Sequence, residues 1–397
     1  MPSDMGSVLF DLTILETETR LTGIGRYVSE LARALGRAGS ERPRVEFLEH
    51  VGWLGDSIVT SDAEGGIERL GTRLRPGMAR YAWAYRHRVG LAAAVRQKRP
   101  DLVHTGFAYA RPLSKLSCPR VVTCHDLIPL LFPEHFSDWH EGFSSGRRRL
   151  DELRYQAADH IIAISHSTAN DLMRLLGISA SRISVVPNGI DLSRWNPEPT
   201  TTDATTRGRL GLAERPYVFY AGEARWNKNA RGMLAGLAHA RAGRPSENLC
   251  LVWAGRLAPE TRRALYKLGR ELGIDDALIF TGYVSDEELR GLYRGAIATL
   301  FVSLAEGFGY PLLEAMAIGC PAVTSNRSSL PELAGDAALL VDPEDPRAIG
   351  EGLALLSSSS NDRARLSAAG RQRAALFTVE RQRDATLDVY ARLVRSS

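Results

Sequence analysis

Short apolar runs alternate along this chain with longer stretches in which apolar residues recur every three or four positions. The runs of the first half lie at residues 7–11, 44–49, 101–106, 120–126, 160–165 and 183–189, and those of the second half at 217–222, 249–255, 277–284, 297–303, 321–325 and 337–342. A short apolar run is typical of a strand buried on both faces, and the periodic stretches are typical of amphipathic helices. The alternation predicts an α/β fold with parallel sheets covered by helices.

The pattern breaks once, between residues 192 and 215, where the chain is polar, rich in Thr and Pro, and without periodicity. A polar segment between two periodic regions is typical of a linker. We therefore expect a Rossmann-like domain over 1–192, a linker with one short helix over 193–215, and a second Rossmann-like domain over 216–376. The two domains are expected to face each other across a cleft.

Composition narrows the class of protein. The 397 residues are 44% apolar and 24% charged, as in a soluble globular protein, and no apolar run approaches the length of a membrane span. The N-terminus lacks the features of a signal peptide, and the four cysteines form no CxxC pair. We expect reduced thiols and a cytoplasmic location. A net charge of +4 is too small to indicate a nucleic-acid partner.

The stretch LAEGFGYPLLEAMAIGCP, residues 304–321, places two carboxylates around a glycine-rich turn at the start of a helix. Gly307 and Gly309 allow the backbone to approach a ligand closely, and Pro311 suits the first helical position. The N-terminus of a helix favours an anion such as a phosphate. The turn therefore predicts an anion-binding site with Glu306 at its edge and Glu314 in the first turn of the helix.

Such a turn can hold the three parts of a nucleoside-diphosphate sugar. Glu306 can accept hydrogen bonds from sugar hydroxyls, the helix N-terminus can hold the diphosphate, and Glu314 can accept from the ribose diol. An alternative stays equally open for Glu314, since a carboxylate near a helix N-terminus is favourable without any ligand.

Five segments together resemble the retaining family 4 glycosyltransferases. They are TGIGRYVSEL (22–31), VTCHDLIPLLFPEHF (122–136), VVPNGID (185–191), YAGEARWNKN (220–229), and EGFGYPLLE (306–314) following TGYVSDEELRGLYRGA. Each motif alone is weak, but all five occur in the family's order, and the resemblance extends from about residue 6 to residue 395. It implies the GT-B fold, with two Rossmann-like domains and a C-terminal helix, 377–397, that packs back on the first domain.

The resemblance also implies roles for residues of the first domain. Gly23 and Gly25 would bring backbone N–H groups to the donor diphosphate, the alternative being a turn that only starts a helix. His125 would face the donor sugar near its anomeric carbon, where a neutral imidazole could bind a hydroxyl and carry charge as the bond breaks. His125 and Glu306 are the expected catalytic residues.

In the second domain, Lys228 matches the family's phosphate-binding lysine. Arg225 is a second candidate phosphate ligand. Family members often place an arginine nearer the preceding glycine, and Glu223 and Ala224 hold those positions here. The role of Arg225 is therefore open.

The segment TGYV is expected to hold the nucleobase through the backbone of Tyr283 and Val284. Ser285 and Glu288 then form the capping box of the next helix, which is a structural role. The remaining residues expected to bind the donor are Gly307, Phe308, Gly309, Tyr310 and Glu314.

The resemblance implies retaining transfer of a hexose, with GDP-mannose as the lead donor and UDP-glucose, UDP-N-acetylglucosamine and dTDP-sugars as alternatives. The acceptor is expected to be a glycan or a lipid-linked saccharide of surface polysaccharide synthesis. No pair of aspartates is placed to hold a metal, because residues 275–276 precede a strand, so we expect neither metal nor other cofactor.

Other functions stay open on the same fold. One is a nucleotide-sugar epimerase or hydrolase, and another is a non-catalytic partner protein. A dehydrogenase is disfavoured, because TGIGRY is not a G-x-G-x-x-G motif. The basic and aromatic segment 80–88 could rest on the inner membrane face, although an ordinary amphipathic helix explains it better.

Overall fold

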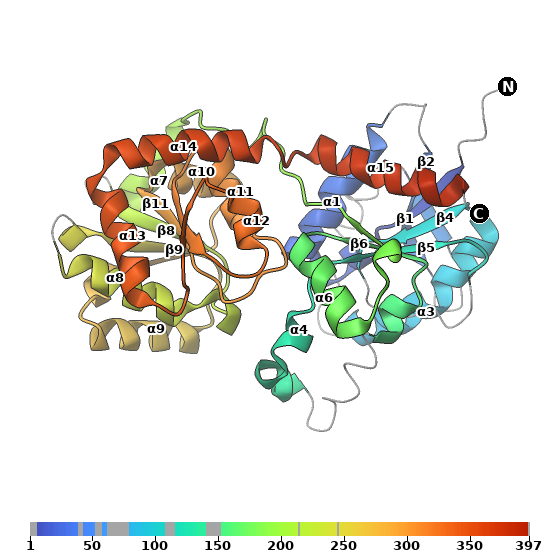
Figure 1. Ribbon diagram of the computed structural model, residues 1–397, viewed down its shortest axis with the longest axis horizontal. Coiled ribbons are helices and arrows are strands. Elements are labelled where there is room, and N and C mark those ends of the chain that lie inside the picture. The colour runs from blue at the N-terminus through green and yellow to red at the C-terminus, as the bar shows by residue number, and fades with distance from the viewer. Residues whose placement is uncertain are drawn as a thin grey trace. The chain divides into compact units, whose positions relative to one another are not determined.

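The structure is a computed structural model that describes residues 6–38, 43–51, 58–61, 79–107, 116–139, 152–212, 215–243 and 246–395. The chain divides into two compact units. Unit 1 comprises Met1–Gly189 with Val379–Ser397, and unit 2 comprises Ile190–Thr378. Each unit contains one twisted sheet with helices on both faces (Figure 1).

The sheet of unit 1 has the order β3-β2-β1-β4-β5-β6-β7, and every neighbouring pair is parallel except β2 and β3. Its strands are β1 (Ser7–Asp11), β2 (Arg44–Val51), β3 (Ile58–Ser61), β4 (Leu102–Thr105), β5 (Arg120–Cys124), β6 (His160–Ala163) and β7 (Ile183–Val185). The chain order reverses between β1 and β4, so their carboxyl ends form the switch point where α/β sheets commonly bind ligands.

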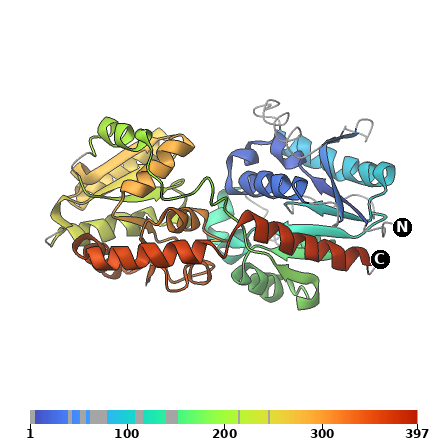
Figure 2. The ribbon, with the colours of Figure 1, turned by 90° about the horizontal axis from the view of Figure 1, so that it is seen from above.

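Helices cover both faces of this sheet. On one face lie α1 (Gly23–Gly36) and α15 (Val379–Arg395), which contact each other, while α3 (Ala79–Lys98) and α6 (His166–Leu176) lie on the other (Figure 1). Figure 2 shows α15, in red, lying along the sheet of unit 1. The last helix therefore belongs to unit 1, although unit 2 precedes it in the sequence.

The sheet of unit 2 is parallel throughout, in the order β10-β9-β8-β11-β12-β13. Its strands are β8 (Tyr217–Ala221), β9 (Cys250–Ala254), β10 (Leu278–Gly282), β11 (Ala298–Phe301), β12 (Ala322–Ser325) and β13 (Leu339–Val341). The switch point of this sheet lies between β8 and β11.

Two layers of helices cover the second sheet. One holds α8 (Ala230–Arg241), α9 (Pro259–Glu271) and α13 (Pro346–Ser358), and the other holds α7 (Thr201–Arg209), α10 (Asp286–Gly295), α11 (Tyr310–Ile318) and α14 (Ser360–Ala374) (Figure 1). Two further α-helices are short, α4 (Ile128–Leu131) in unit 1 and α12 (Leu330–Ala334) in unit 2.

All twelve apolar runs of the sequence form strands, and the expected α/β fold with two Rossmann-like units is confirmed. The pattern missed β3, an antiparallel edge strand of four residues that pairs with β2 across an irregular register. A strand this short carries too few alternations to stand out from the polar sequence around it.

The expected linker, 193–215, instead belongs to unit 2. Its helix α7 packs against α10, and both oxygens of the Asp203 carboxylate accept hydrogen bonds from Arg294, at 2.6 Å each. A guanidinium that binds a carboxylate through two nitrogens fixes both position and orientation. Polar composition alone could not reveal that this segment is anchored.

Candidate active site

The candidate donor-binding residues of unit 2 follow the two strands at its switch point. Lys228 lies in the loop after β8, within a 3₁₀ turn at Trp226–Lys228, and Glu306 lies in the loop after β11. Because β8 and β11 are neighbours, the topology brings together two loops that are 78 residues apart in sequence. The Lys228 Nζ atom lies 2.6 Å from Glu306 Oε1.

This ion pair lies at the boundary between protein and solvent. The side chains of Lys228 and Glu306 are 21% and 10% exposed, and the ammonium also lies 5.5 Å from the centre of the Phe301 ring. An ammonium has three N–H donors, so Glu306 leaves capacity on Lys228 for a second anion. The pair provides a positioned cation beside a carboxylate, which suits a phosphate next to a sugar.

Two asparagines, to which we assigned no role from the sequence, hold the loops together. The backbone N–H of Leu304 donates to Asn227 O at 2.8 Å, and Asn227 Nδ2 donates to Ala305 O at 3.0 Å. Asn229 Nδ2 donates to Val302 O at 3.0 Å, while Asn229 itself caps α8 with a left-handed φ of +58°. Asparagine tolerates a left-handed backbone better than most residues. This preference is the local signal by which the sequence could have indicated the role of Asn229.

Two serines hold the Glu306 loop from its other side. The Glu306 backbone N–H donates to Ser328 Oγ at 2.9 Å, and Ser329 Oγ contacts the carbonyls of Glu306 and Phe308 at 2.9 and 3.0 Å. Ser328 has a φ of +52°, an uncommon backbone for serine. These serines follow β12, so only the tertiary fold brings them to the loop.

The glycine turn leads directly into α11. Gly309 is its N-cap, with a φ of +111° and no side-chain capping bond, and Leu312 and Leu313 donate their N–H groups to its carbonyl. The positive φ requires glycine here. The Phe308 ring is buried edge-on against Tyr310 and Phe377, so its ring belongs to the core and only its backbone is left for a ligand.

Glu314 lies deeper than the sequence suggested. The helix begins at Tyr310, which makes Pro311 its second residue and Glu314 its fifth, so Glu314 is in the second turn rather than the first. It is buried, and the Tyr293 hydroxyl donates to Glu314 Oε2 at 3.0 Å and contacts Pro311 O at 3.2 Å. Glu314 thus contributes to the packing of α10 on α11.

Two of the other residues expected near the donor, Arg225 and Tyr283, are solvent-exposed. The Arg225 side chain is 65% exposed and pairs with Glu223 at 2.7 Å. Tyr283 follows β10 and is 72% exposed, with the Arg256 guanidinium 5.4 Å from its ring centre, while Val284 is half-buried. The structure brings neither Arg225 nor Tyr283 into the network around Glu306.

In unit 1 the glycines expected near the diphosphate begin α1, whose first residue is Gly23. A Cβ atom on Gly25 would lie 2.2 Å from the Cα atom of Arg20, in a 3₁₀ turn at Glu18–Leu21. The close approach of this turn to the helix therefore requires glycine at position 25, whether or not a ligand binds. This close approach supports the alternative that the glycines form a turn that only starts a helix.

His125 directly follows β5, beside the switch point of unit 1. Its Nε2 atom lies 2.8 Å from the carbonyl oxygen of Gly106, the residue that directly follows β4. A carbonyl only accepts, so Nε2 carries the proton and Nδ1 of the neutral ring is an acceptor. Burial lowers the pKa of His125 to about 4, against a smaller opposing effect of the bond to Gly106. The imidazole is therefore uncharged near neutral pH.

Comparison with known proteins assigns the family. The model of Glycosyltransferase Family 4 matches residues 21–194, and that of Glycosyl transferases group 1 matches residues 203–373. The D-inositol 3-phosphate glycosyltransferase of Xylanimonas cellulosilytica is 30% identical to this chain, over 94% of the chain and 92% of that protein. The chain belongs to the family 4 glycosyltransferases.

Other relatives of this glycosyltransferase agree with the assignment. The O-antigen chain mannosyltransferase B of Escherichia coli is 28% identical, over 83% of this chain and 85% of that protein. The sucrose-phosphate synthase of Thermosynechococcus elongatus superposes with a TM-score of 0.75 at 21% identity, over 99% of this chain and 100% of that structure. The expected GT-B fold is confirmed.

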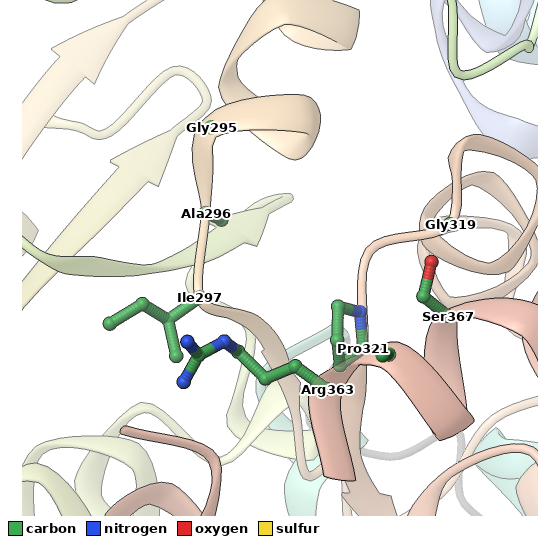
Figure 3. Close-up of a pocket in the computed structure, with 8 residues that line it drawn as sticks. Gly295, Ala296, Ile297, Gly319, Pro321, Arg363 and Ser367 are labelled. Atoms are coloured by element: carbon green, nitrogen blue, oxygen red, sulfur yellow. The ribbon is translucent and has the colours of Figure 1, made fainter. Parts of the chain in front are cut away.

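A hollow of about 410 Å³ lies elsewhere in unit 2 of the glycosyltransferase (Figure 3). It is lined by Gly295, Ile297, Gly319, Pro321, Arg363 and Ser367, at the amino ends of β11 and β12. Lys228 and Glu306 follow the carboxyl ends of their strands, so the hollow lies at the opposite edge of the sheet. It is not part of the candidate donor site.

Neither a metal site nor a membrane-spanning helix is found among the described residues. No group of three or more His, Cys, Asp or Glu side chains in the described ranges is arranged as a metal site. Within the same part of the chain, no helix has the length and apolar character needed to cross a bilayer. The segment 80–88, considered above for membrane contact, lies in α3, but the side chains of residues 80–86 and 88 are outside the description.

Proposed function

We propose that this glycosyltransferase transfers a mannosyl residue from GDP-mannose, with retention of configuration, to a glycan or lipid-linked acceptor in surface polysaccharide synthesis. The observation that carries the donor site is the Lys228–Glu306 pair at the switch point of unit 2, tied to a glycine turn that opens α11. Similarity to the O-antigen chain mannosyltransferase B supports mannose as the sugar.

The departing nucleoside diphosphate needs its growing negative charge neutralised. Lys228 and the N-terminus of α11 are the groups proposed to do this, and Glu306 is proposed to accept hydrogen bonds from hydroxyls of the sugar. The carboxylate also holds the ammonium in place at 2.6 Å. With these groups at hand the proposed reaction uses no metal.

His125 is proposed to bind a hydroxyl of the donor sugar through Nδ1, because Nε2 is engaged by Gly106. An imidazole kept neutral by burial can accept this bond at any pH near neutrality. In the reaction the bond from the anomeric carbon to the phosphate oxygen breaks, and the acceptor oxygen bonds to the same face. The acceptor proton passes to the departing phosphate. This course of reaction is taken from the family resemblance.

The decisive experiment is a panel of thermal shifts in the presence of chelator, with GDP, UDP, ADP, dTDP, NAD and the common nucleotide sugars. A ligand at about 100 times its dissociation constant adds roughly 2.7 kcal/mol to stability. The largest shift is expected for GDP and GDP-mannose. A shift that appears only after a divalent metal is added would overturn the metal-free mechanism, and no shift with any nucleotide would favour a non-catalytic protein.

Turnover then separates transfer from the other reactions of the same fold. We expect GDP-mannose to lose its sugar slowly in water and much faster with a suitable glycan acceptor. Release of GDP at the same rate with and without acceptors would indicate a hydrolase. Conversion of the sugar without release of GDP would indicate an epimerase.

A further inference from the structure

Four buried polar side chains form a chain of hydrogen bonds through unit 1. The Tyr390 hydroxyl on α15 lies 2.5 Å from His104 Nδ1, and His104 Nε2 lies 2.8 Å from Thr123 Oγ1. Thr123 Oγ1 in turn lies 2.8 Å from the Tyr27 hydroxyl on α1. The chain thus links the last helix of the protein to its first helix across strands β4 and β5.

The alternation of the strands places these groups on one face of the sheet. On β4, Val103 packs in the core with α3, and the next residue, His104, faces Tyr390. On β5, Val122 packs in the core with α6, and the next residue, Thr123, faces Tyr27. Apolar residues would suit these fully buried positions better, because buried polar groups destabilise a fold unless they are paired. Here each group is paired with the next.

The central histidine makes the chain directional. Burial lowers the pKa of His104 to about 3, so its ring is neutral. A neutral imidazole has one N–H and one lone pair, so it donates on one side and accepts on the other. The role of the Tyr390 hydroxyl at Nδ1, as donor or acceptor, therefore sets whether His104 Nε2 donates to Thr123 or accepts from it.

The far end of the chain touches the candidate catalytic histidine. The Tyr27 ring lies edge-on to the His125 ring, with centroids 4.8 Å apart and planes at 87°. The bond to Gly106 fixes only one edge of the imidazole. Of the two aromatic rings beside it, Tyr27 is nearer than Phe107, with centroids 4.8 and 6.1 Å from that of His125, so Tyr27 is the closer contact that bears on its tilt. A Cβ atom on Gly106 would lie 2.7 Å from Val28 Cγ2, so α1 packs tightly here.

We propose that Tyr390, acting through His104 and Thr123, holds the Tyr27 ring against His125, so that α15 is a positioning element for the candidate catalytic imidazole. The consequence for catalysis rests on the function proposed above for His125, whereas the structural link does not. This positioning element begins directly after Thr378, the last residue of unit 2.

Two variants break the chain at different points. Tyr390→Phe removes the hydroxyl at its beginning, and Thr123→Val removes the hydroxyl that bonds to both His104 and Tyr27. Tyr217→Phe is the matched control, because Tyr217 is equally buried and its hydroxyl donates to Leu292 O at 2.9 Å within unit 2. Each variant is made in the full chain, and its melting temperature is compared with that of the natural sequence.

The first readout is the nitrogen NMR spectrum of protein whose histidines carry a nitrogen isotope label. The ring signals of His125 are assigned by their loss in the His125→Gln variant. We expect Tyr390→Phe and Thr123→Val to shift the His125 ring signals, and Tyr217→Phe to leave them in place. Unchanged His125 signals in both chain variants would overturn the proposal. This readout needs no substrate, so it decides the link even if the proposed function is wrong.

The second readout is the release of GDP from GDP-mannose. We expect a fall of about tenfold in kcat for both chain variants with little change in KM, because a small misplacement of a reacting group lowers the rate more than the affinity. The control should keep both constants. An equal loss in Tyr217→Phe, or a change confined to KM, would contradict positioning. If the natural sequence releases no GDP, that result counts against GDP-mannose as the donor and not against the link between Tyr390 and His125.

Discussion

In this glycosyltransferase the polar groups at the switch point of unit 2 and beside that of unit 1 are of opposite kinds. In unit 2, Lys228 and Glu306 are charged, paired and partly exposed, and asparagines and serines of neighbouring loops anchor them. In unit 1, His125 is buried and neutral, and an aromatic ring and a backbone carbonyl orient it. The same sheet architecture thus supports a site for charge in one unit and a site for an uncharged base in the other.

The difference follows from where each group can be solvated. A charged pair needs water or a ligand to offset its desolvation, so it lies at the edge of its sheet. A neutral imidazole can be buried, and burial keeps it neutral by lowering its pKa. The charged pair of unit 2 suits the anionic part of the proposed donor, and the neutral imidazole of unit 1 suits a sugar hydroxyl.

Loss of the carboxylate in unit 2 is expected to have the largest effect. Glu306→Gln should lower the rate of GDP release from GDP-mannose about 100-fold or more, because the group proposed to hold the sugar is lost. Glu223→Gln is the control, since Glu223 lies in an exposed pair with Arg225. Steady-state kinetics beside melting curves would test this. Full activity in Glu306→Gln would remove Glu306 from the site.

The two cations of unit 2 should differ in their effect on affinity. Lys228→Met should weaken GDP binding by about tenfold to 100-fold, as expected for the loss of a charged hydrogen bond to phosphate. Arg225→Met should change it much less, because Arg225 is exposed and paired with Glu223. Isothermal titration of both variants measures the difference. A larger loss in Arg225→Met would reverse the assignment of the phosphate ligand.

The two units should also respond differently to acid. The pKa values of His104, His125 and His160 are lowered by burial to about 3, 4 and 4, and all three lie in unit 1. The unfolded chain therefore binds protons between about pH 6.5 and 4 that folded unit 1 does not bind, and stability falls as the pH is lowered through this window. Each histidine adds a slope of up to about 1.4 kcal/mol per pH unit.

His125→Gln removes one group that only the unfolded chain protonates in this window. The slope of the unfolding free energy against pH should therefore fall by the contribution of about one proton. Hydrogen exchange, corrected for the intrinsic effect of pH, measures it separately in peptides from β5 and from β9. Peptides from β9 should keep the slope of the natural sequence and thus serve as an internal control. An unchanged slope in β5 would mean that His125 is not held neutral by burial.

The smallest expected effect lies outside both sites. Ser285 and Glu288 form the reciprocal capping box of α10, as the sequence predicted. Ser285→Ala should lower the stability of α10 by about 1 kcal/mol, seen as faster exchange in its peptides. GDP affinity should stay unchanged. A loss of affinity in this variant would show that modest destabilisation of unit 2 is enough to disturb the site, and would weaken the inference from Lys228.

Local patterns were enough to predict most of the fold. Buried strands and amphipathic helices have distinct periods, so the apolar runs marked every described strand except the short edge strand β3. The turn before α11 was also predictable, because the left-handed backbone of Gly309 needs glycine and Pro311 suits a helix start. Glu306 stood out from its place beside this turn, whereas Lys228 stood out only because its motif resembles that of the family.

Other features depend on contacts between distant parts of the chain. Ser328 reaches Glu306 across 22 residues, and Asn227 reaches Ala305 across 78. Such contacts have no period or local signature. The depth of Glu314 was misjudged for a related reason, since the first residue of a helix depends on its cap as much as on its apolar pattern.

Local sterics and hydrophobic periodicity depend on neighbouring residues, so the order of residues along the chain was enough to place the strands, the helices, the glycine turn before α11 and the motifs of the family. Which side chains share a site depends instead on contacts between distant parts of the chain. The tertiary structure buried His104 and Thr123 within one sheet face and brought Tyr390 to His104 across 286 residues. It also exposed Arg225 while anchoring Lys228. Burial and pairing set the charge of each group, and both arise only when the sheets form.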